Sequence, residues 1–147
     1  MPTDNASLPD STPTVAKRSR RKSARPSEIV EAALQVFVEK GFAATRVEDV
    51  ARYAGVAKAT VFVYFPTKEA LFKAVVRAKI VDPLAGFKDH AAAHTGSTRD
   101  LIMRALHEWW TRIGGTKAGG ISKLMMQEAK RFPELANFYQ SEVLSPA

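Results

Sequence analysis

The sequence predicts an all-α protein in which a three-helix head is joined by a fourth helix to a helical second half. Apolar residues recur three and four positions apart through most of the 147 residues, which is the spacing of one helix face. Glycine or proline ends these segments, and Ser or Thr followed three positions later by an acidic residue starts two of them. No cysteine is present, so neither disulfides nor thiolate metal sites are expected.

The first 25 residues are predicted to form a disordered basic arm. Residues 1–16 are rich in Pro, Ser, Thr, Asp and Asn and have little to bury. The run KRSRRKSAR follows, so that residues 1–25 hold six cations and two anions and supply four of the seven net positive charges. Positive charge is therefore concentrated at the N-terminus.

Residues 26–81 are predicted to form one domain that begins with a helix near Pro26 and Ser27, because a proline ring and a hydroxyl both suit a helix start. Gly41 is predicted to end this helix. Its expected buried stripe is Ile29, Ala33, Val36 and Phe37.

The second helix is short and amphipathic. Thr45 and Glu48 have the spacing of a capping box, which predicts that the helix starts at Thr45. Gly55 stands where a left-handed residue lets the chain leave a short helix and turn into the next one. The residues expected on the buried face are Val47, Val50, Ala51 and Ala54.

The third helix, residues 57–65, would turn Val61 and Phe65 toward the core. Its other positions carry a cation, a hydroxyl and two aromatic rings, which is unusual for an exposed face unless a partner docks there. The major groove of DNA admits one α-helix, whose first residues reach the base edges. The pair of helices around Gly55 therefore predicts a helix-turn-helix that reads double-stranded DNA.

Each exposed position of the third helix has an expected role. Lys58 and Thr60 are predicted to contact base edges. Phe62 can neither donate nor accept a hydrogen bond, so its expected contact is apolar, for instance with a thymine methyl. Tyr64 and Lys68 are predicted to bind phosphates. The alternative is that Phe62 and Tyr64 complete a small hydrophobic core.

A longer pattern runs through this region and continues into YFPTKEAL, further than a general helix-turn-helix would. It consists of Phe42, Thr45, Val50, Ala51, Ala54, Gly55, Val56, Lys58, Thr60, Tyr64, Phe65, Lys68, Glu69, Ala70 and Leu71. In these residues the chain, from about residue 27 to 76, resembles the DNA-binding domain of TetR-family transcriptional regulators. The resemblance implies a homodimer on a palindromic operator. By position, it implies DNA contacts at Lys58, Thr60, Phe62, Tyr64 and Lys68. The predicted set of DNA contacts also includes Thr45, Arg46, Ala59 and Val63.

Three positions depart from the family pattern: Ala57 where Ser is usual, Ala59 where Gly is usual, and Phe62 where Tyr is usual. Each change removes a polar contact or adds a methyl group, which affects the operator sequence and not the mode of docking. The adjacent basic arm is predicted to neutralise phosphates or to lie in the minor groove, making binding steeply salt-dependent. The alternative for the arm is a solvated tail that adds only solubility.

Thr67 is predicted to cap a fourth helix that runs from Lys68 to about Val81 and links the two halves. Asp82 and Pro83 are predicted to stop it. The side chains expected to face inward are Leu71, Phe72, Val75 and Ala78.

Residues 82–147 are predicted to form a helical effector and dimerisation domain. An Ala-rich segment comes first, a helix capped by Ser97 and Asp100 then runs to Gly114, another covers residues 121–131, and Pro133 starts the last. Effector domains of the TetR family continue for several tens of residues past the equivalent of Ala147, so the resemblance implies that this domain is incomplete here.

Soft, bulky side chains in the second half could line a pocket for a small apolar effector. The same side chains could instead form plain core. The candidate lining is Leu106, Trp109, Trp110, Met125 and Phe138.

Other site classes find little support in the sequence. His90 and His94 are four residues apart, but no third ligand is evident, so no metal site is expected. There is no nucleophile motif, phosphate-binding loop or cofactor fingerprint, so neither a cofactor nor catalysis is expected. No secretory segment and no run of about 18 apolar residues is found, which predicts a cytoplasmic protein with no membrane partner.

The predicted function is sequence-specific DNA binding by a transcriptional regulator, a ligand-responsive repressor that binds a palindromic operator as a dimer. Two alternatives belong to other classes. The first is a truncated fragment that binds DNA or a homologue without ligand control, and the second is a small helical ligand-binding protein whose basic arm is incidental.

Overall fold

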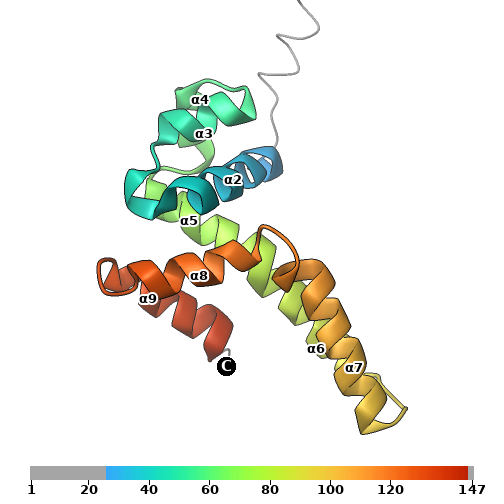
Figure 1. The fold of residues 1–147 in the computed structure, drawn as a ribbon. Helices are drawn as coiled ribbons and strands as arrows, with labels where there is room; N and C mark the ends of the chain where they lie inside the picture. The colour runs from blue at the N-terminus through green and yellow to red at the C-terminus, as the bar shows by residue number, and fades with distance from the viewer. Residues whose placement is uncertain (1–25, 146–147) are drawn as a thin grey trace, which may run out of the picture.

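The structure is a computed structural model that describes residues 26–145. Every regular element in that part of the chain is a helix, which confirms the all-α prediction. The helices within residues 26–76 form a head at one end, and the later helices form a body that extends away from it (Figure 1). The predicted basic arm, residues 1–25, lies outside the described residues.

The first described helix, α2, spans Pro26–Ala44 and is interrupted at Gly41, which has φ 79° and ψ 170°. A left-handed φ of this kind favours glycine, which has no Cβ. The helix therefore begins and breaks where the sequence predicted. Its buried residues include the four that were expected and are Ile29, Val30, Ala32, Ala33, Leu34, Val36, Phe37 and Phe42.

Helices α3, Val47–Ala54, and α4, Lys58–Tyr64, form the helix-turn-helix. Gly55 joins them with φ 72° and ψ 30°, the left-handed C-cap that the sequence predicted. The backbone N–H of Val56 donates to the carbonyl of Ala51 at 2.9 Å, which closes the turn. These backbone contacts fix the direction in which the chain leaves α3 toward α4.

The capping box predicted at Thr45 is wrong. The residue before α3 is Arg46, and no side chain caps that helix. Thr45 is only 2% exposed, and its hydroxyl donates to the carbonyl oxygen of Gly41 at 2.6 Å. The carbonyl of Gly41 is one of the last four of α2, which have no intrahelical partner. A buried hydroxyl needs an acceptor, so Thr45 stabilises the corner before α3 instead of the start of α3.

The predicted stop at Asp82 and Pro83 is also wrong. Helix α5, Lys68–Val76, passes through a π-turn, η1, Arg77–Val81, directly into α6, Asp82–Ala92. The backbone N–H of Asp82 donates to the carbonyl of Arg77, five residues back, so the hydrogen-bond register slips just before Pro83, which has no N–H to donate. The start at Thr67 is confirmed, since its side chain accepts from the N–H of Ala70 at 3.0 Å.

The π-turn also corrects the inward face of this helix. Ala78, which was expected to face inward, is exposed. Val76 and Ile80 are buried in its place. An extra residue in the turn rotates every later side chain around the helix axis. Helical spacing counted from Leu71 therefore no longer predicts which side chains face inward beyond Val76.

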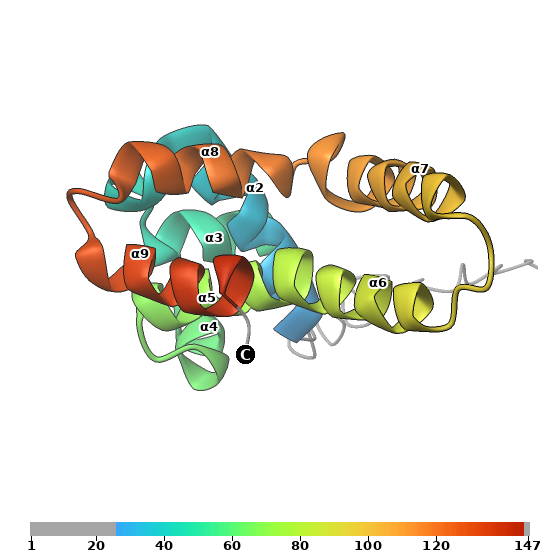
Figure 2. The same cartoon turned by 90° about the horizontal axis from the view of Figure 1, so that it is seen from below.

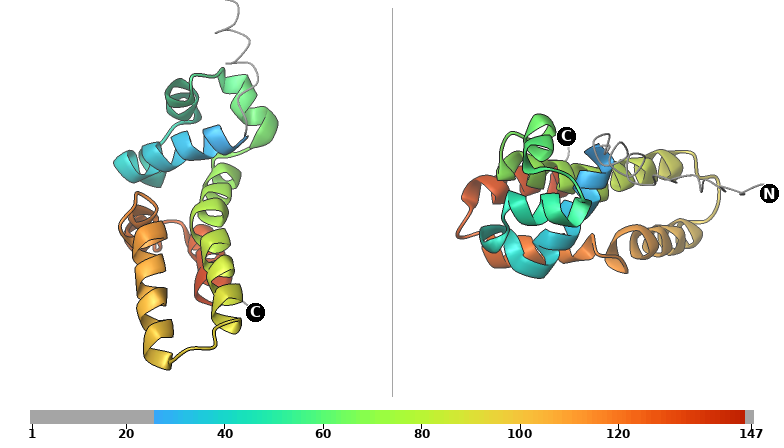
Figure 3. Two further views of the ribbon diagram at one scale, coloured as in Figure 1. Left: turned by 90° about the vertical axis from the view of Figure 1, so that its right-hand side faces the viewer. Right: turned by 90° about the horizontal axis from the view of Figure 1, so that it is seen from above.

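The body contains three further helical segments. Helix α7, Thr98–Trp109, continues through η2, Trp110–Gly114; α8 spans Gly119–Glu128; and α9, Pro133–Tyr139, continues through η3, Gln140–Leu144. The cap predicted at Ser97 is confirmed, because its hydroxyl oxygen accepts from the N–H of Asp100 at 3.2 Å. Helices α6 and α7 run side by side as a hairpin, while α8 and α9 lie under the head (Figures 2 and 3).

The core of the head continues into the body through aromatic rings. Phe72 of α5 lies edge-on to Phe37 and to Phe42 of α2, at centroid distances of 5.2 and 5.5 Å. Phe132, which precedes α9, lies edge-on to Phe42 at 4.7 Å. Such contacts add about 0.5–1.5 kcal/mol each beyond their area, so head and body share one packed junction.

Candidate nucleic-acid interface

Helix α4 lies at the outer end of the head, away from the hairpin of α6 and α7 (Figure 1). Val61 anchors it, with no exposed surface. Phe62, Val63 and Tyr64 are 38%, 77% and 44% exposed. Phe62 and Tyr64 therefore do not complete the core, and the alternative that assigned them there is not supported.

The first turn of α4 presents small or charged groups to solvent. Ala57, Lys58 and Ala59 are exposed, and Thr60 is half-buried. The ammonium of Lys58 forms an ion pair with the carboxylate of Glu48 on α3 and lies 5.6 Å from the centroid of the Phe62 ring. The hydrogen bond from Lys58 holds the pKa of Glu48 below its ordinary value of 4.5, so this carboxylate is charged at neutral pH.

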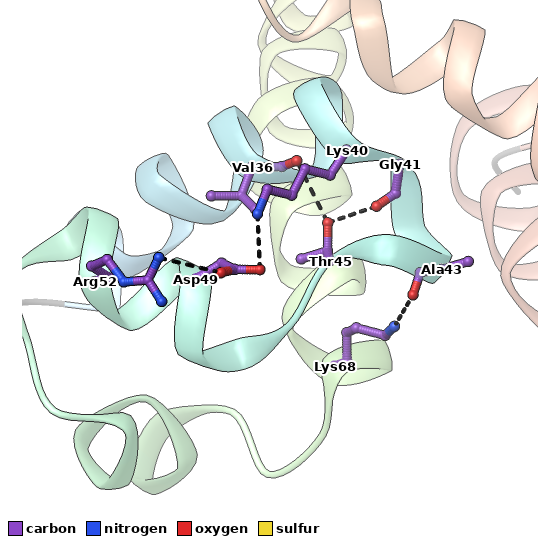
Figure 4. A network of polar contacts seen from close by, with 8 residues as sticks. All are labelled: Val36, Lys40, Gly41, Ala43, Thr45, Asp49, Arg52 and Lys68. Atoms are coloured by element: carbon purple, nitrogen blue, oxygen red, sulfur yellow. Dashed lines mark hydrogen bonds and ion pairs between the residues drawn. The ribbon is translucent and has the colours of Figure 1, made fainter.

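Lys68 has a different place from the one predicted. Its ammonium donates to the backbone carbonyls of Phe42 at 2.9 Å and Ala43 at 3.3 Å, and the contact with Ala43 is drawn in Figure 4. It also lies 4.5 Å from the centroid of the Phe42 ring. Both hydrogen bonds are to the protein's own backbone. The main role of Lys68 in this structure is therefore to hold the start of α5 to the end of α2.

Thr45 is likewise withdrawn from the surface by its burial and its inward hydroxyl, which argues against a DNA contact through its side chain. Arg46, the next residue, is exposed. Before α3, the guanidinium of Arg46 is therefore accessible to a partner, whereas the hydroxyl of Thr45 points inward.

Sequence reasoning missed a charged network beside this corner. Asp49 of α3 lies 3.1 Å from the ammonium of Lys40 and 3.7 Å from the guanidinium of Arg52 (Figure 4). The hydrogen bond from Lys40 is the main reason why the pKa of Asp49 lies below its ordinary value of 3.8. The spacing of Asp49 and Arg52 was visible in the sequence, but the contact with Lys40 depends on how α2 and α3 pack.

The predicted ligand-binding residues do not share one pocket. Leu106 and Trp109 line a hollow of about 240 Å³ between α6 and α7. Met125 lines another, of about 470 Å³, between α8 and the last helical segment. Trp110 and Phe138 line neither hollow, and Phe138 lies instead beneath the cations of Lys73 and Arg77, at 5.4 and 5.1 Å. The prediction of one shared pocket was wrong, because these residues lie on different helices that enclose different hollows.

His90 lies on α6 and His94 lies in the loop that follows it. His90 and His94 line a shallow hollow of about 500 Å³, and His94 Nε2 lies 3.1 Å from the carbonyl oxygen of Ser97. Within residues 26–145, no three His, Asp or Glu side chains are placed to hold a metal ion. No helix in that part of the chain is long and apolar enough to cross a bilayer.

Comparison with known proteins matches the same region. Residues 29–75 match the model for bacterial regulatory proteins of the tetR family. The HTH-type transcriptional regulator RutR of Escherichia coli (strain K12) is 46% identical over 83 residues, which cover 54% of this chain and 39% of RutR.

Solved structures extend the likeness into the body. A Mesorhizobium loti protein described as a TetR-family transcriptional regulator superposes with a TM-score of 0.68 at 24% identity, covering 86% of this chain and 62% of that one. The flavonoid-responsive regulator FrrA superposes with a TM-score of 0.59 at 30% identity, covering 81% and 60%. The chain thus spans between about two fifths and three fifths of the length of these proteins.

Proposed function

This chain belongs to the TetR family of bacterial regulatory proteins, and from that premise we propose that it is a cytoplasmic repressor that binds a palindromic operator as a homodimer. The observation that carries the proposal is the outward face of α4. It lies free at the tip of the head, opposite the buried Val61, and is long enough to enter one major groove of B-DNA.

In this proposal α4 lies in the major groove with its first turn toward the bases. Lys58 and Thr60 contact base edges there, and Phe62 and Val63 make apolar contacts. The hydroxyl of Tyr64 and the guanidinium of Arg46 bind phosphates, which fix the register of the head on the duplex. Residues 17–25 add cations that release counterions from the DNA, so affinity falls steeply with salt.

The proposed homodimer draws support from the apolar surface of α7. Ile102, Met103, Leu106, Trp109 and Trp110 are all exposed, and a contiguous apolar patch of this kind usually marks an interaction surface. A two-fold dimer places two α4 helices on one face of the DNA, which explains why a palindromic site would be read.

Ligand control is proposed to act through the hollow between α6 and α7. Its lining is apolar apart from Glu108 and Arg112, and one carboxylate oxygen of Glu108 is buried with no hydrogen-bond partner. A small apolar ligand with one N–H or O–H donor could satisfy that oxygen. The name of FrrA describes a flavonoid response, and this supports a ligand-responsive body in the present chain.

A ligand in that hollow can affect α4 through two rigid connections. The continuous helix from α5 through η1 to α6 joins the hollow to the head. The edge-on contact of Phe132 with Phe42 joins the body to α2. A ligand that binds better to the arrangement with spread heads would weaken operator binding, and by linkage the operator would weaken ligand binding equally.

The test begins with selection of duplexes from random DNA by the 147-residue chain, followed by affinity measurements at fixed salt. Lys58→Ala should weaken operator binding about tenfold or more, because a base contact contributes about 1–3 kcal/mol. Tyr64→Phe should weaken it severalfold through one lost phosphate contact. Lys123→Ala, which removes an exposed cation on α8, is the matched control. Unchanged affinity for both Lys58→Ala and Tyr64→Phe would reject the proposal.

A further inference from the structure

The outermost face of α4 is apolar. At about 100° per residue, Ala59, Phe62 and Val63 lie between about 100° and 200° around the helix axis from Val61, which is fully buried. Their spacing of i, i+3 and i+4 makes them neighbours on one surface. All three are exposed, and we call them the apolar ridge.

The polar groups beside the ridge are few. Lys58 is engaged with Glu48 and lies over the Phe62 ring, so a hydrogen bond from Lys58 to guanine would have to compete with an existing ion pair. Thr60 is half-buried, and Tyr64 lies at the far end of the helix. The groups that can hydrogen-bond to bases or phosphates therefore lie at the edges of this face, and its centre is apolar.

In the major groove, the apolar feature that distinguishes one base from another is the C5-methyl group of thymine. We propose that the apolar ridge selects operator half-sites by the thymine methyl groups that it covers, with Phe62 as the main specificity-determining residue. This inference rests on the proposed function and adds to it the chemical group that α4 recognises.

The surroundings of the ridge fit a duplex as its occupant. Exposed cations at Lys40, Arg46 and Arg52 lie on the same head. Lys40 and Arg52 share the carboxylate of Asp49, while Arg46 can bind a phosphate beside a groove. A major groove whose wall carries thymine methyl groups and whose edges carry phosphates matches both the apolar ridge and the cations of the head.

The experiment replaces thymine by uracil in the selected operator, one position at a time. Uracil keeps the base pair and its hydrogen-bonding groups and removes only the methyl. Loss of one buried methyl should weaken binding about fourfold at each position that the ridge covers. Affinity is measured by fluorescence anisotropy with the 147-residue chain.

Variants connect the methyl groups to the ridge. In Phe62→Ala the penalty for uracil at the covered position should disappear, whereas Tyr64→Phe, which removes only a hydroxyl, should retain it. Circular dichroism shows whether Phe62→Ala keeps the helical fold, and Val63→Ala provides a milder change on the same ridge that should reduce the penalty at its own position.

The outcomes separate this inference from the proposed function. If selection enriches no sequence, the proposed function fails and the inference fails with it. If the enriched half-sites lack thymine, or if uracil binds as tightly as thymine, only the inference is overturned. A uracil penalty that is the same in Phe62→Ala and Val63→Ala as in the unchanged chain would also overturn it.

Discussion

The ammonium of Lys68 lies 2.9 Å from the backbone carbonyl oxygen of Phe42 and 4.5 Å from the centroid of the Phe42 ring, across a separation of 26 residues. This contact joins the start of α5 to the end of α2, where the last four carbonyl groups of the helix have no intrahelical partner. A cation at the end of a helix is also favoured by the helix dipole. Lys68 therefore holds the start of α5 against the end of α2.

Replacement of Lys68 by Met should lower the free energy of unfolding by about 1–2 kcal/mol, because hydrogen bonds from a charged donor to a backbone carbonyl are lost. Urea denaturation of the purified chain measures this. Arg52→Met, which removes an exposed cation with a 3.7 Å ion pair, is the control and should change the free energy by less than about 0.5 kcal/mol. Equal effects of the two variants would contradict the structural role of Lys68.

The ion pair of Asp49 with Lys40 should make stability depend on pH in the acid range. The pKa of Asp49 is lower in the folded protein than its ordinary value of 3.8. The stabilisation is therefore fully present above that value and is lost as the pH falls through the lower, folded pKa.

Thermal unfolding between pH 7 and pH 2.5 measures this. The Tm of the unchanged chain should exceed that of Asp49→Asn at pH 7, and the two should converge as Asp49 becomes protonated. A difference that stays constant down to pH 2.5 would show that the charge of Asp49 does not contribute. High salt should also reduce the difference at pH 7, since the pair is partly exposed.

Features set by a few neighbouring residues were predictable from the sequence. The caps at Thr67 and Ser97 and the left-handed turn at Gly55 all depend on contacts within about four residues, and the structure has them as expected. The exposed aromatic rings on α4 also followed from helical spacing counted from Val61.

Features that depend on packing were not predictable. The hydroxyl of Thr45 has the spacing of a cap toward Glu48, but the break in α2 offers it the carbonyl of Gly41 and a buried site. Pro83 is typical of a helix end, because proline has no N–H to donate. The π-turn just before it shifts the hydrogen-bond register, and the helix continues past it. Trp109 and Met125 are both pocket-like residues, and only the three-dimensional arrangement shows that they face different hollows.

The close contact of Gly120 on α8 with Val38 on α2 should be sensitive to a single methyl group. A Cβ at Gly120 would lie 2.9 Å from Cγ1 and 3.0 Å from Cγ2 of Val38, and the stiff side chain of valine cannot rotate away easily. Alanine is a better helix former than glycine by about 1 kcal/mol, but overpacking costs about 1–3 kcal/mol.

Gly120→Ala should therefore be neutral or destabilising alone and stabilising in a Val38→Ala background. Urea denaturation of the four proteins in this cycle should give a coupling energy of about 1–2 kcal/mol. If the two substitutions add within about 0.5 kcal/mol, α2 and α8 do not pack as closely as described. The result matters for function, because this contact fixes how the head sits on the body.

The exposed stripe on α7 should mediate self-association of the chain. Met103, Leu106 and Trp110 are spaced at i, i+3 and i+7, so they lie on one side of the helix, and all three are exposed. Covering them with a second copy would remove apolar surface from water, which favours association by about 1.5–3 kcal/mol for each large side chain fully buried. Sedimentation velocity across a range of micromolar concentrations should show a dimer that dissociates on dilution.

Met103→Lys and Trp110→Lys should each weaken that dimer about tenfold or more, because a charge cannot be buried without a partner. Tyr53→Lys is the matched control: it places the same charge on an exposed aromatic residue of the head, outside the stripe. A monomer at every concentration, or equal weakening by all three variants, would remove α7 as the dimer surface. If Met103→Lys also flattens the concentration dependence of operator binding, the paired heads and the α7 stripe belong to the same assembly.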